Sequence, residues 1–103
     1  MAKVVYIAGP ITGVPDYKRH FNQAENDLLM RGYIPLNPAK LPEGLTNGQY
    51  ARIDFAMIDS ADAVLFLAGW LNSVGANLEW DYCRYTGKPQ ATAIDELKEV
   101  LKQ

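Results

Sequence analysis

Two short stretches of this chain are apolar along almost their whole length: KVVYIA at residues 3–8 and AVLFLA at residues 63–68. Neither stretch alternates polar with apolar residues, as a strand with one solvent-exposed face does. A strand that is apolar on both sides suits the interior of a parallel sheet, where both faces are covered. Parallel neighbours must be joined by a crossover, which is usually a helix. These two stretches therefore predict an α/β fold.

The rest of the chain supplies the helices that such a sheet needs. Residues 16–31 carry Phe21, Ala24 and Leu28 at helical spacing, and Gly32 is the expected helix terminus. We expect further helices at residues 49–60, 73–85 and 94–102, strands at 33–36 and more weakly at 91–93, and one long loop over 37–48. This alternation predicts right-handed βαβ units in a parallel sheet with helices on both faces.

Size and charge limit the classes of function. With 103 residues the chain is expected to form a single domain, residues 1–103. Its formal net charge of -2, with scattered lysines and arginines, argues against a nucleic-acid polymer as partner. The single cysteine, Cys83, excludes an internal disulfide, and no segment has the pattern of a signal peptide or a membrane span. We therefore expect a cytoplasmic protein without a membrane partner.

The stretch SVGANLE, residues 73–79, combines a helix start with a lone acid. Ligands of parallel sheets bind at the carboxyl ends of the strands, next to which this segment should lie. With Ser73 as N-cap, the Glu79 carboxylate leans toward Gly75, where the missing side chain leaves room. The positive end of the helix favours its ionised form. Alternatively, Gly75 only allows close packing and Glu79 is a surface acid; the spacing alone leaves both readings open.

Helical placement puts Asp54 on the inner face of the second helix. The expected inward stripe consists of Tyr50, Ile53, Met57, Ile58 and Ala61. Asp54 falls inside this stripe, whereas Asp59 falls outside it and should be exposed. Burial raises the pKa of a carboxyl group toward values that suit proton transfer. Asp54 either belongs to a site or binds loop backbone, and the former is favoured.

Tyr6 lies in the otherwise aliphatic first strand, where a buried hydroxyl needs a hydrogen-bond partner. Glu79 is one candidate for that partner, since the helix that carries it should lie beside this strand. A backbone carbonyl is the other candidate, and the sequence does not decide between them.

Other residues give weaker signals. The loop GPITGVPD matches neither common phosphate-binding motif, although Gly13 and the following helix start could offer N–H groups. Trp70 either stacks on a planar ligand or covers the core. We expect His20 at the surface and Cys83 as a packed thiol. No metal-ligand spacing is present, so no metal or cofactor is expected.

Three segments together resemble the nucleoside 2-deoxyribosyltransferase family: VYIAGPITG, then Asp54 with DSADAVLFLAGW behind it, then SVGANLEWDYCRYTGKP. The resemblance covers residues 4–89. The family includes the 2′-deoxynucleoside 5′-phosphate N-hydrolases and short members found in phage and bacterial genomes. It implies a flavodoxin-like (Rossmann-like) α/β fold and cleavage of an N-glycosidic bond.

The resemblance also implies catalytic roles. Glu79 stands at the position of the nucleophile that attacks C1′ of a 2-deoxyribosyl group and forms a glycosyl-enzyme. Asp54 matches the acid that contacts or protonates the departing base. Tyr6 matches the tyrosine that orients the nucleophile. The intermediate would pass its sugar to water in a hydrolase, or to a second base in a transferase.

Substrate-binding roles follow from the same resemblance. Ser73, Gly9 and Gly13 match contacts to the 5′ end of the substrate, and Pro10 and Ile11 belong to the same loop. Gly75 would give the sugar room. Trp70 is counted as a binding candidate only because of its place in the loop after residues 63–68, where it could stack on a planar ligand. The partner implied is therefore a small nucleoside or nucleotide.

The chain departs from the transferase pattern around the nucleophile. Transferases often have an acid just before the serine and glycine, where this chain has Asn72 and an inserted Val74. That spacing is closer to the nucleotide hydrolases and favours 2′-deoxynucleoside 5′-monophosphates, whereas Asp16 near the presumed phosphate loop argues against them. The resemblance fades after Pro89. A homodimer or higher homo-oligomer is expected, and the sequence leaves open whether a neighbouring subunit completes the site.

Two other functions compete with this one. A non-catalytic nucleotide-binding module would keep the same cavity and would bind its ligand without the Glu79 carboxylate. A phosphoribohydrolase related to cytokinin-activating enzymes also places a glutamate after a glycine-rich turn. Its typical PGGxGTxxE sequence is absent here, so it ranks last.

Overall fold

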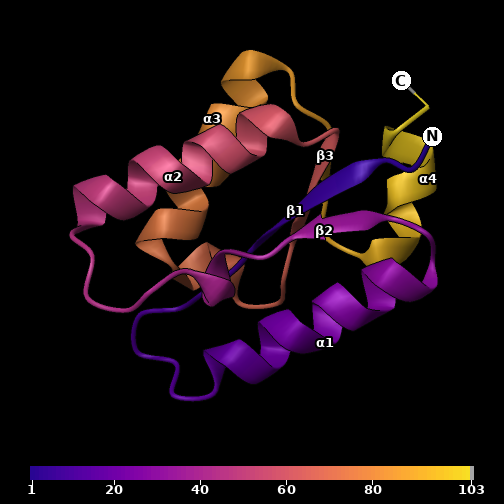
Figure 1. Cartoon of the computed structure of the whole chain (residues 1–103). Coiled ribbons are helices and arrows are strands. Elements are labelled where there is room, and N and C mark those ends of the chain that lie inside the picture. The colour runs from indigo at the N-terminus through magenta and orange to yellow at the C-terminus, as the bar shows by residue number, and fades with distance from the viewer. Residues whose placement is uncertain (103) are drawn as a thin grey trace.

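A computed structural model describes residues 1–102 of the chain. Strands and helices alternate from the N-terminus to the C-terminus (Figure 1). The strands are β1 (Val4–Ala8), β2 (Ile34–Leu36), β3 (Ala63–Phe66) and β4 (Gln90–Ala91). The helices are α1 (Tyr17–Met30), α2 (Asn47–Ser60), α3 (Val74–Thr86) and α4 (Leu97–Val100). Short 3₁₀ turns lie at Pro38–Lys40, Trp70–Asn72 and Ile94–Glu96.

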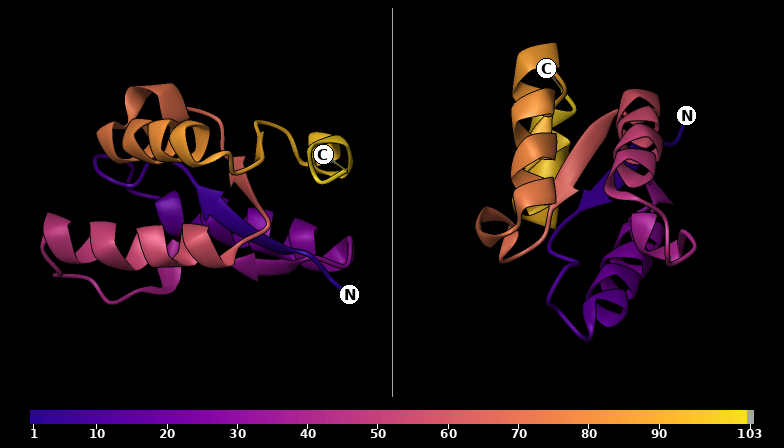
Figure 2. Two further views of the ribbon diagram at one scale, coloured as in Figure 1. Left: turned by 90° about the horizontal axis from the view of Figure 1, so that it is seen from above. Right: turned by 90° about the vertical axis from the view of Figure 1, so that its left-hand side faces the viewer.

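The four strands form one parallel sheet in the order β2-β1-β3-β4. The two apolar strands, β1 and β3, are therefore central, as their sequences predict. Val5 pairs with Pro35 of β2 on one side and with Ala63 of β3 on the other. Helices lie on both sides of the sheet (Figure 2), which confirms the predicted α/β architecture.

Alternate residues of β1 face two different core clusters. Val5 and Ile7 pack with Phe21 and Leu28 of α1 and with Leu97 of α4. On the other face, Tyr6 and Ala8 pack in a cluster that includes Ile58 of α2 and Cys83 of α3. Both clusters are almost free of solvent, because their large side chains are only 0–4% exposed. This two-sided burial is the reason why β1 carries no polar alternation.

The first helix begins and ends near the predicted residues. Gly32 adopts a φ of 85°, in the left-handed region where glycine is favoured, and it ends α1. Asp16 occupies the N-cap position but makes no capping hydrogen bond. Its carboxylate instead contacts the Arg19 guanidinium at 2.5 Å and the His20 ring at 3.3 Å. His20 is exposed, as predicted.

The predicted loop over residues 37–48 contains more structure than expected. A 3₁₀ turn covers Pro38–Lys40, and α2 already begins at Asn47. Thr46 caps α2, because its hydroxyl accepts from the Gln49 N–H while the Gln49 side chain accepts from the Thr46 N–H. The signal for this capping box, TNGQ, is present in the sequence and places the helix start two residues earlier than predicted.

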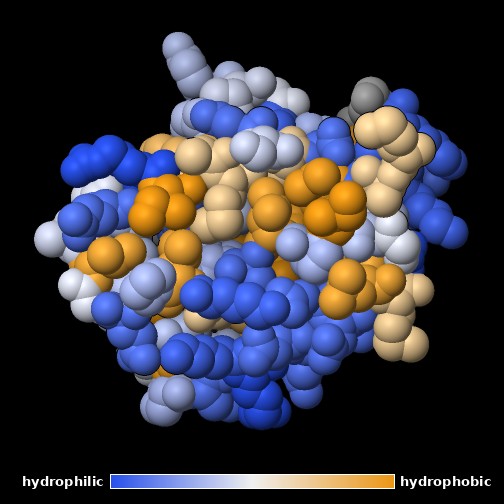
Figure 3. Space-filling view, viewed as in Figure 1, coloured by the Kyte–Doolittle hydropathy of each residue, from blue (hydrophilic) through white to orange (hydrophobic). Residues whose placement is uncertain are grey.

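The inward stripe of α2 and the C-terminal region also differ in detail from the prediction. Ile53 is 37% exposed, whereas Phe55 is partly buried and stacks on Tyr82. The predicted C-terminal helix is divided into a 3₁₀ turn and the short α4. In Figure 3, apolar side chains gather over β1 and β2, and the surface over α1 is mostly hydrophilic. Within residues 1–102, no helix is both long and apolar enough to span a membrane.

Candidate active site

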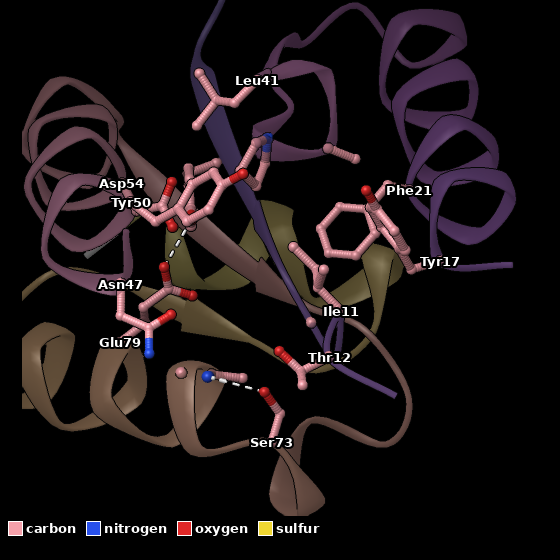
Figure 4. Close-up of a pocket in the computed structure, with 16 residues that line it drawn as sticks. Ile11, Thr12, Tyr17, Phe21, Leu41, Asn47, Tyr50, Asp54, Ser73 and Glu79 are labelled. Atoms are coloured by element: carbon pink, nitrogen blue, oxygen red, sulfur yellow. Dashed lines mark hydrogen bonds between the residues drawn. The ribbon is translucent and has the colours of Figure 1, made fainter. Parts of the chain in front are cut away.

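A cavity of about 220 Å³ opens beside the carboxyl end of β1. Its walls come from β1 and the loop after it, from α1, from the segment before α2, from α2, and from the start of α3. Figure 4 shows that Asp54 and Tyr50 project into it from α2, opposite Tyr17 and Phe21 of α1. Thr12 and Ser73 lie at another end. The cavity is therefore where parallel sheets bind their ligands.

Glu79 lies at the base of this cavity, on the first half of α3. Ser73 caps the helix, because its hydroxyl accepts from the Ala76 N–H at 3.2 Å. A Cβ added to Gly75 would meet no atom within 4 Å, so the glycine leaves open space in front of the acid. The Glu79 side chain is buried at 8% exposure, which excludes the reading of a surface acid.

Tyr6 holds the Glu79 carboxylate in place. The phenol donates a hydrogen bond of 2.7 Å to Oε2 of Glu79, so the partner of Tyr6 is this acid and not a backbone carbonyl. Burial and the neighbouring Glu79 and Asp54 carboxylates raise the pKa of Tyr6 well above its usual value. Tyr6 is therefore a permanent hydrogen-bond donor at physiological pH.

Burial dominates the ionisation of Glu79. Desolvation raises its pKa to about 8, the hydrogen bond from Tyr6 opposes this rise, and the Asp54 carboxylate adds to it. The net effect favours the neutral form, whereas the sequence predicts that the start of α3 favours the ionised form. Helix-terminal charge acts mainly on the first turn, and α3 starts at Val74, so Glu79 lies beyond that turn.

Asp54 faces the same cavity from α2. Burial raises its pKa to about 6. Its Oδ1 is buried without a hydrogen-bond partner among the described residues, so this oxygen is free for a group that enters the cavity. Asp59, in contrast, is exposed and accepts a hydrogen bond from the Tyr82 hydroxyl at 2.6 Å. The predicted difference between these two acids is confirmed.

The other predicted binding residues divide into two groups. Gly9, Ile11, Ser73 and Gly75 line the cavity. At Gly9 a Cβ would approach the Cβ of Leu67 to 3.1 Å, so this glycine also allows β1 to pack closely against the segment after β3.

Pro10, Gly13 and Trp70 are not among the residues that line the cavity. Pro10 borders a separate groove beside α1. The Trp70 ring stacks on Trp80 with a centroid distance of 4.4 Å and contacts Phe66 at 5.4 Å. Trp70 therefore covers the core, which is the second of the two roles that its sequence position allows.

Several lining residues have no strong sequence signal. Thr12, Tyr17, Leu41, Asn47 and Tyr50 come from four different parts of the chain. The position of Tyr50, one helical turn before Asp54 on the same stripe, could have identified it. The others lie in segments without helical or strand periodicity, or at a helix start, where pattern says little about direction.

The remaining titratable residues do not enlarge the site. Within residues 1–102, no group of three or more histidine, cysteine, aspartate and glutamate side chains could hold a metal ion. Cys83 is buried, and burial raises the pKa of its thiol to about 12, so it stays protonated. The predicted homo-oligomer and the cytoplasmic location stay predictions.

Comparison with known proteins supports the fold. A family model described as a domain of unknown function (DUF4406) matches residues 3–92. The solved structure of a 2-deoxyribosyltransferase from the psychrotolerant bacterium Bacillus psychrosaccharolyticus superposes with a TM-score of 0.67 and 22% sequence identity. The match covers 88% of this chain and 75% of that chain. No match was found among curated protein sequences. The structural match confirms the predicted flavodoxin-like fold and, at the level of the fold, the resemblance to nucleoside 2-deoxyribosyltransferases.

Proposed function

The chain belongs to the DUF4406 family, whose description assigns no activity, and we propose that it cleaves the N-glycosidic bond of 2′-deoxynucleosides. One observation carries the proposal: a buried glutamate, held at 2.7 Å by a tyrosine hydroxyl, shares a cavity with a second carboxyl group whose Oδ1 has no partner among the described residues. Most enzymes that cleave glycosidic bonds use two carboxyl groups in one cavity. The 2-deoxyribosyltransferase of similar fold supports the same chemistry.

The reaction needs two different roles for the two carboxyl groups. The ionised Glu79 carboxylate attacks C1′ of the sugar, and the bond from C1′ to the base nitrogen breaks with its electron pair moving to the base. Asp54 gives its proton to that nitrogen, and a glycosyl ester on Glu79 results. Water or a second base then attacks C1′, and Asp54 takes up the proton that the attacking group loses. The bond from C1′ to Glu79 breaks, and the Glu79 carboxylate is released.

The pKa values of the pair determine how many molecules have the protons in this arrangement. One proton leaves the pair near pH 6 and the next near pH 8, so between these values the two carboxyl groups share a single proton. The higher pKa of Glu79 places this proton mainly on Glu79, whereas catalysis requires it on Asp54, so the active form is the minor one of the two singly protonated forms. We expect kcat/KM to show a bell-shaped pH dependence with its limbs near these two values, and a pH-independent rate across this range would contradict the assignment.

The charge of the cavity favours a nucleoside over its 5′-monophosphate. The titratable side chains that line it are the two carboxyl groups and three tyrosines, all of them acids. Lys18 follows the lining residue Tyr17, but its ammonium is paired with Glu43 at 3.2 Å. Two like charges about 7 Å apart repel by about 2 kcal/mol at an effective dielectric of about 20. A phosphate would therefore bind at a cost, despite the hydrolase-like spacing around Val74.

Chromatography of reaction mixtures tests the function. Purified protein is incubated with each deoxynucleoside and its 5′-monophosphate, with and without a free acceptor base. Free base alone indicates a hydrolase, and a new nucleoside that forms only with acceptor indicates a transferase. Glu79→Gln should abolish turnover, whereas the matched carboxylate-to-amide change Asp59→Asn on the outer face of α2 should leave it intact.

The same experiment can refute the proposal. If wild-type protein binds nucleosides but leaves every one of them intact, the non-catalytic binding module becomes the better reading. Full activity in Glu79→Gln would remove the covalent mechanism.

A further inference from the structure

Tyr50 connects the cavity wall to the segment that precedes α2. Its hydroxyl donates a hydrogen bond of 2.6 Å to the Pro42 carbonyl and accepts one of 3.4 Å from the Leu45 N–H. One phenol thus holds two backbone groups three residues apart. We refer to residues 41–46 as the strap. At the same time the Tyr50 side chain lines the cavity, one helical turn before Asp54 (Figure 4).

The strap is also attached on the opposite side of the cavity. The Glu43 carboxylate accepts from the Lys18 ammonium at 3.2 Å, and Lys18 follows Tyr17, which lines the wall formed by α1. This ion pair is exposed, so its contribution to stability is small. The strap therefore runs from α2 to α1, with Tyr50 as the stronger of its two attachments.

One residue of the strap faces the cavity. Leu41 lines the cavity and lies above Asp54 and Tyr50 in the view of Figure 4. Its apolar side chain and the Tyr50 ring line the same cavity as Asp54. The other titratable groups that face this region are Tyr6 from β1 and Glu79 from α3.

We propose that Tyr50 is a positioning residue: its hydroxyl fixes the strap over the cavity, and the fixed strap keeps water from the Asp54 carboxyl group and holds it toward the departing base. The inference rests on the proposed function for the identity of that base. The inference goes beyond the proposed function because it gives a role to Tyr50, a residue that need not touch the reacting atoms.

Burial of Asp54 is the link between the strap and the chemistry. Desolvation alone raises the pKa of Asp54, and its Oδ1 has no protein partner among the described residues. A loosened strap would admit water to this oxygen, and the pKa of Asp54 would fall toward the usual value of an aspartate. Asp54 would then be protonated in a smaller fraction of the molecules at neutral pH, and fewer molecules could donate a proton to the base.

Tyr50→Phe tests the proposal, because it keeps the ring and removes only the hydroxyl. We expect kcat/KM to fall about 10-fold, in line with the loss of one or two hydrogen bonds, with most of the loss in kcat because fewer molecules hold the proton on Asp54. The acidic limb of the pH profile should move to lower pH, since that limb reports Asp54. Tyr85→Phe is the matched control: Tyr85 is 93% exposed on α3, and the variant should match wild type.

A second readout does not depend on turnover. The carboxyl carbon of Asp54 can be titrated by NMR in the unliganded wild-type protein and in Tyr50→Phe. A lower pKa in the variant supports the proposal, and an unchanged pKa overturns it. Because this titration needs no substrate, it decides the role of Tyr50 even if no nucleoside is cleaved and the proposed function fails.

Glu43→Gln provides a variant that disturbs only exposed atoms. It removes the weaker attachment of the strap, so the pKa of Asp54 should shift in the same direction by a smaller amount. If Tyr50→Phe does not fold, this variant together with Lys18→Met carries the test. No shift in either of them would overturn the proposal.

Discussion

At the scale of single residues, the hydrogen bond from Tyr6 to Glu79 controls how readily the acid ionises. The bond stabilises the carboxylate and holds the pKa of Glu79 below the value that burial alone would give. Tyr6→Phe should therefore raise this pKa further. We expect the basic limb of the kcat/KM profile to move to higher pH and activity at pH 7 to fall by about 10-fold. A profile identical to that of the wild type would contradict the role of Tyr6.

Asp54 allows a sharper test than loss of activity. Asp54→Asn removes the proton donor, and we expect a loss of about 10²- to 10⁴-fold in kcat for an ordinary base. The loss should shrink for nucleosides whose base leaves easily without protonation. Kinetics with a series of leaving groups measure this dependence. An equal loss across the series would assign Asp54 to structure instead of proton transfer.

At the scale of elements, the glycine at the start of α3 lowers the stability of the helix and leaves open space in the cavity. Gly75 lines the cavity with room for a side chain, and it is the second residue of α3. Gly75→Ala should stabilise the helix, by about 0.5–1 kcal/mol, while the added methyl group occupies space meant for the sugar. We expect a higher Tm together with a higher KM.

Gly48→Ala is the matched control for that prediction. Gly48 is the second residue of α2, does not line the cavity, and has room for a Cβ at 3.6 Å from the Arg52 side chain. It should gain stability without a change in KM. If both variants behave alike, the open space in front of Glu79 is not a substrate site.

The elements also show how far the sequence can be interpreted. The central strands and the face of α2 that carries Asp54 could be predicted, because two-sided burial and helical periodicity are local patterns. The pairing of Tyr6 with Glu79 could be proposed but not decided, since 73 positions separate the two residues. The attachments of the strap could not be predicted, because the Tyr50 bonds depend on how the irregular strap folds back and the Lys18 pair depends on where α1 lies. The raised pKa of Glu79 could not be predicted either, because it results from burial, which depends on tertiary packing.

At the scale of the whole molecule, the two cavity acids make stability depend on pH. Their pKa values rise on folding, to about 8 from 4.5 for Glu79 and to about 6 from 3.8 for Asp54. The unfolded chain therefore releases these protons first as the pH rises. The contribution of the two acids to the free energy of unfolding is complete below about pH 4 and is lost as the pH rises to 8. The loss is about 1.4 kcal/mol for each unit by which the pKa in the folded protein exceeds that in the unfolded chain.

Urea unfolding at several pH values measures this effect. We expect the midpoint to fall between pH 5 and 8 in wild-type protein, and Glu79→Gln should remove most of the fall. Asp16 and Glu96 have lowered pKa values, so their contributions change at more acidic pH and leave this window clear. A wild-type midpoint that rises over the window would contradict the buried acids.

The stacked rings of Trp70 and Trp80 give the molecule an optical signature of its own. Their centroids are 4.4 Å apart and their planes differ by 21°, so their electronic transitions couple. Circular dichroism should show an exciton couplet, a positive and a negative band of similar size. Trp80 directly follows Glu79, and Trp70 belongs to the turn before α3. The couplet would therefore record displacement of this turn while the helical signal stays constant.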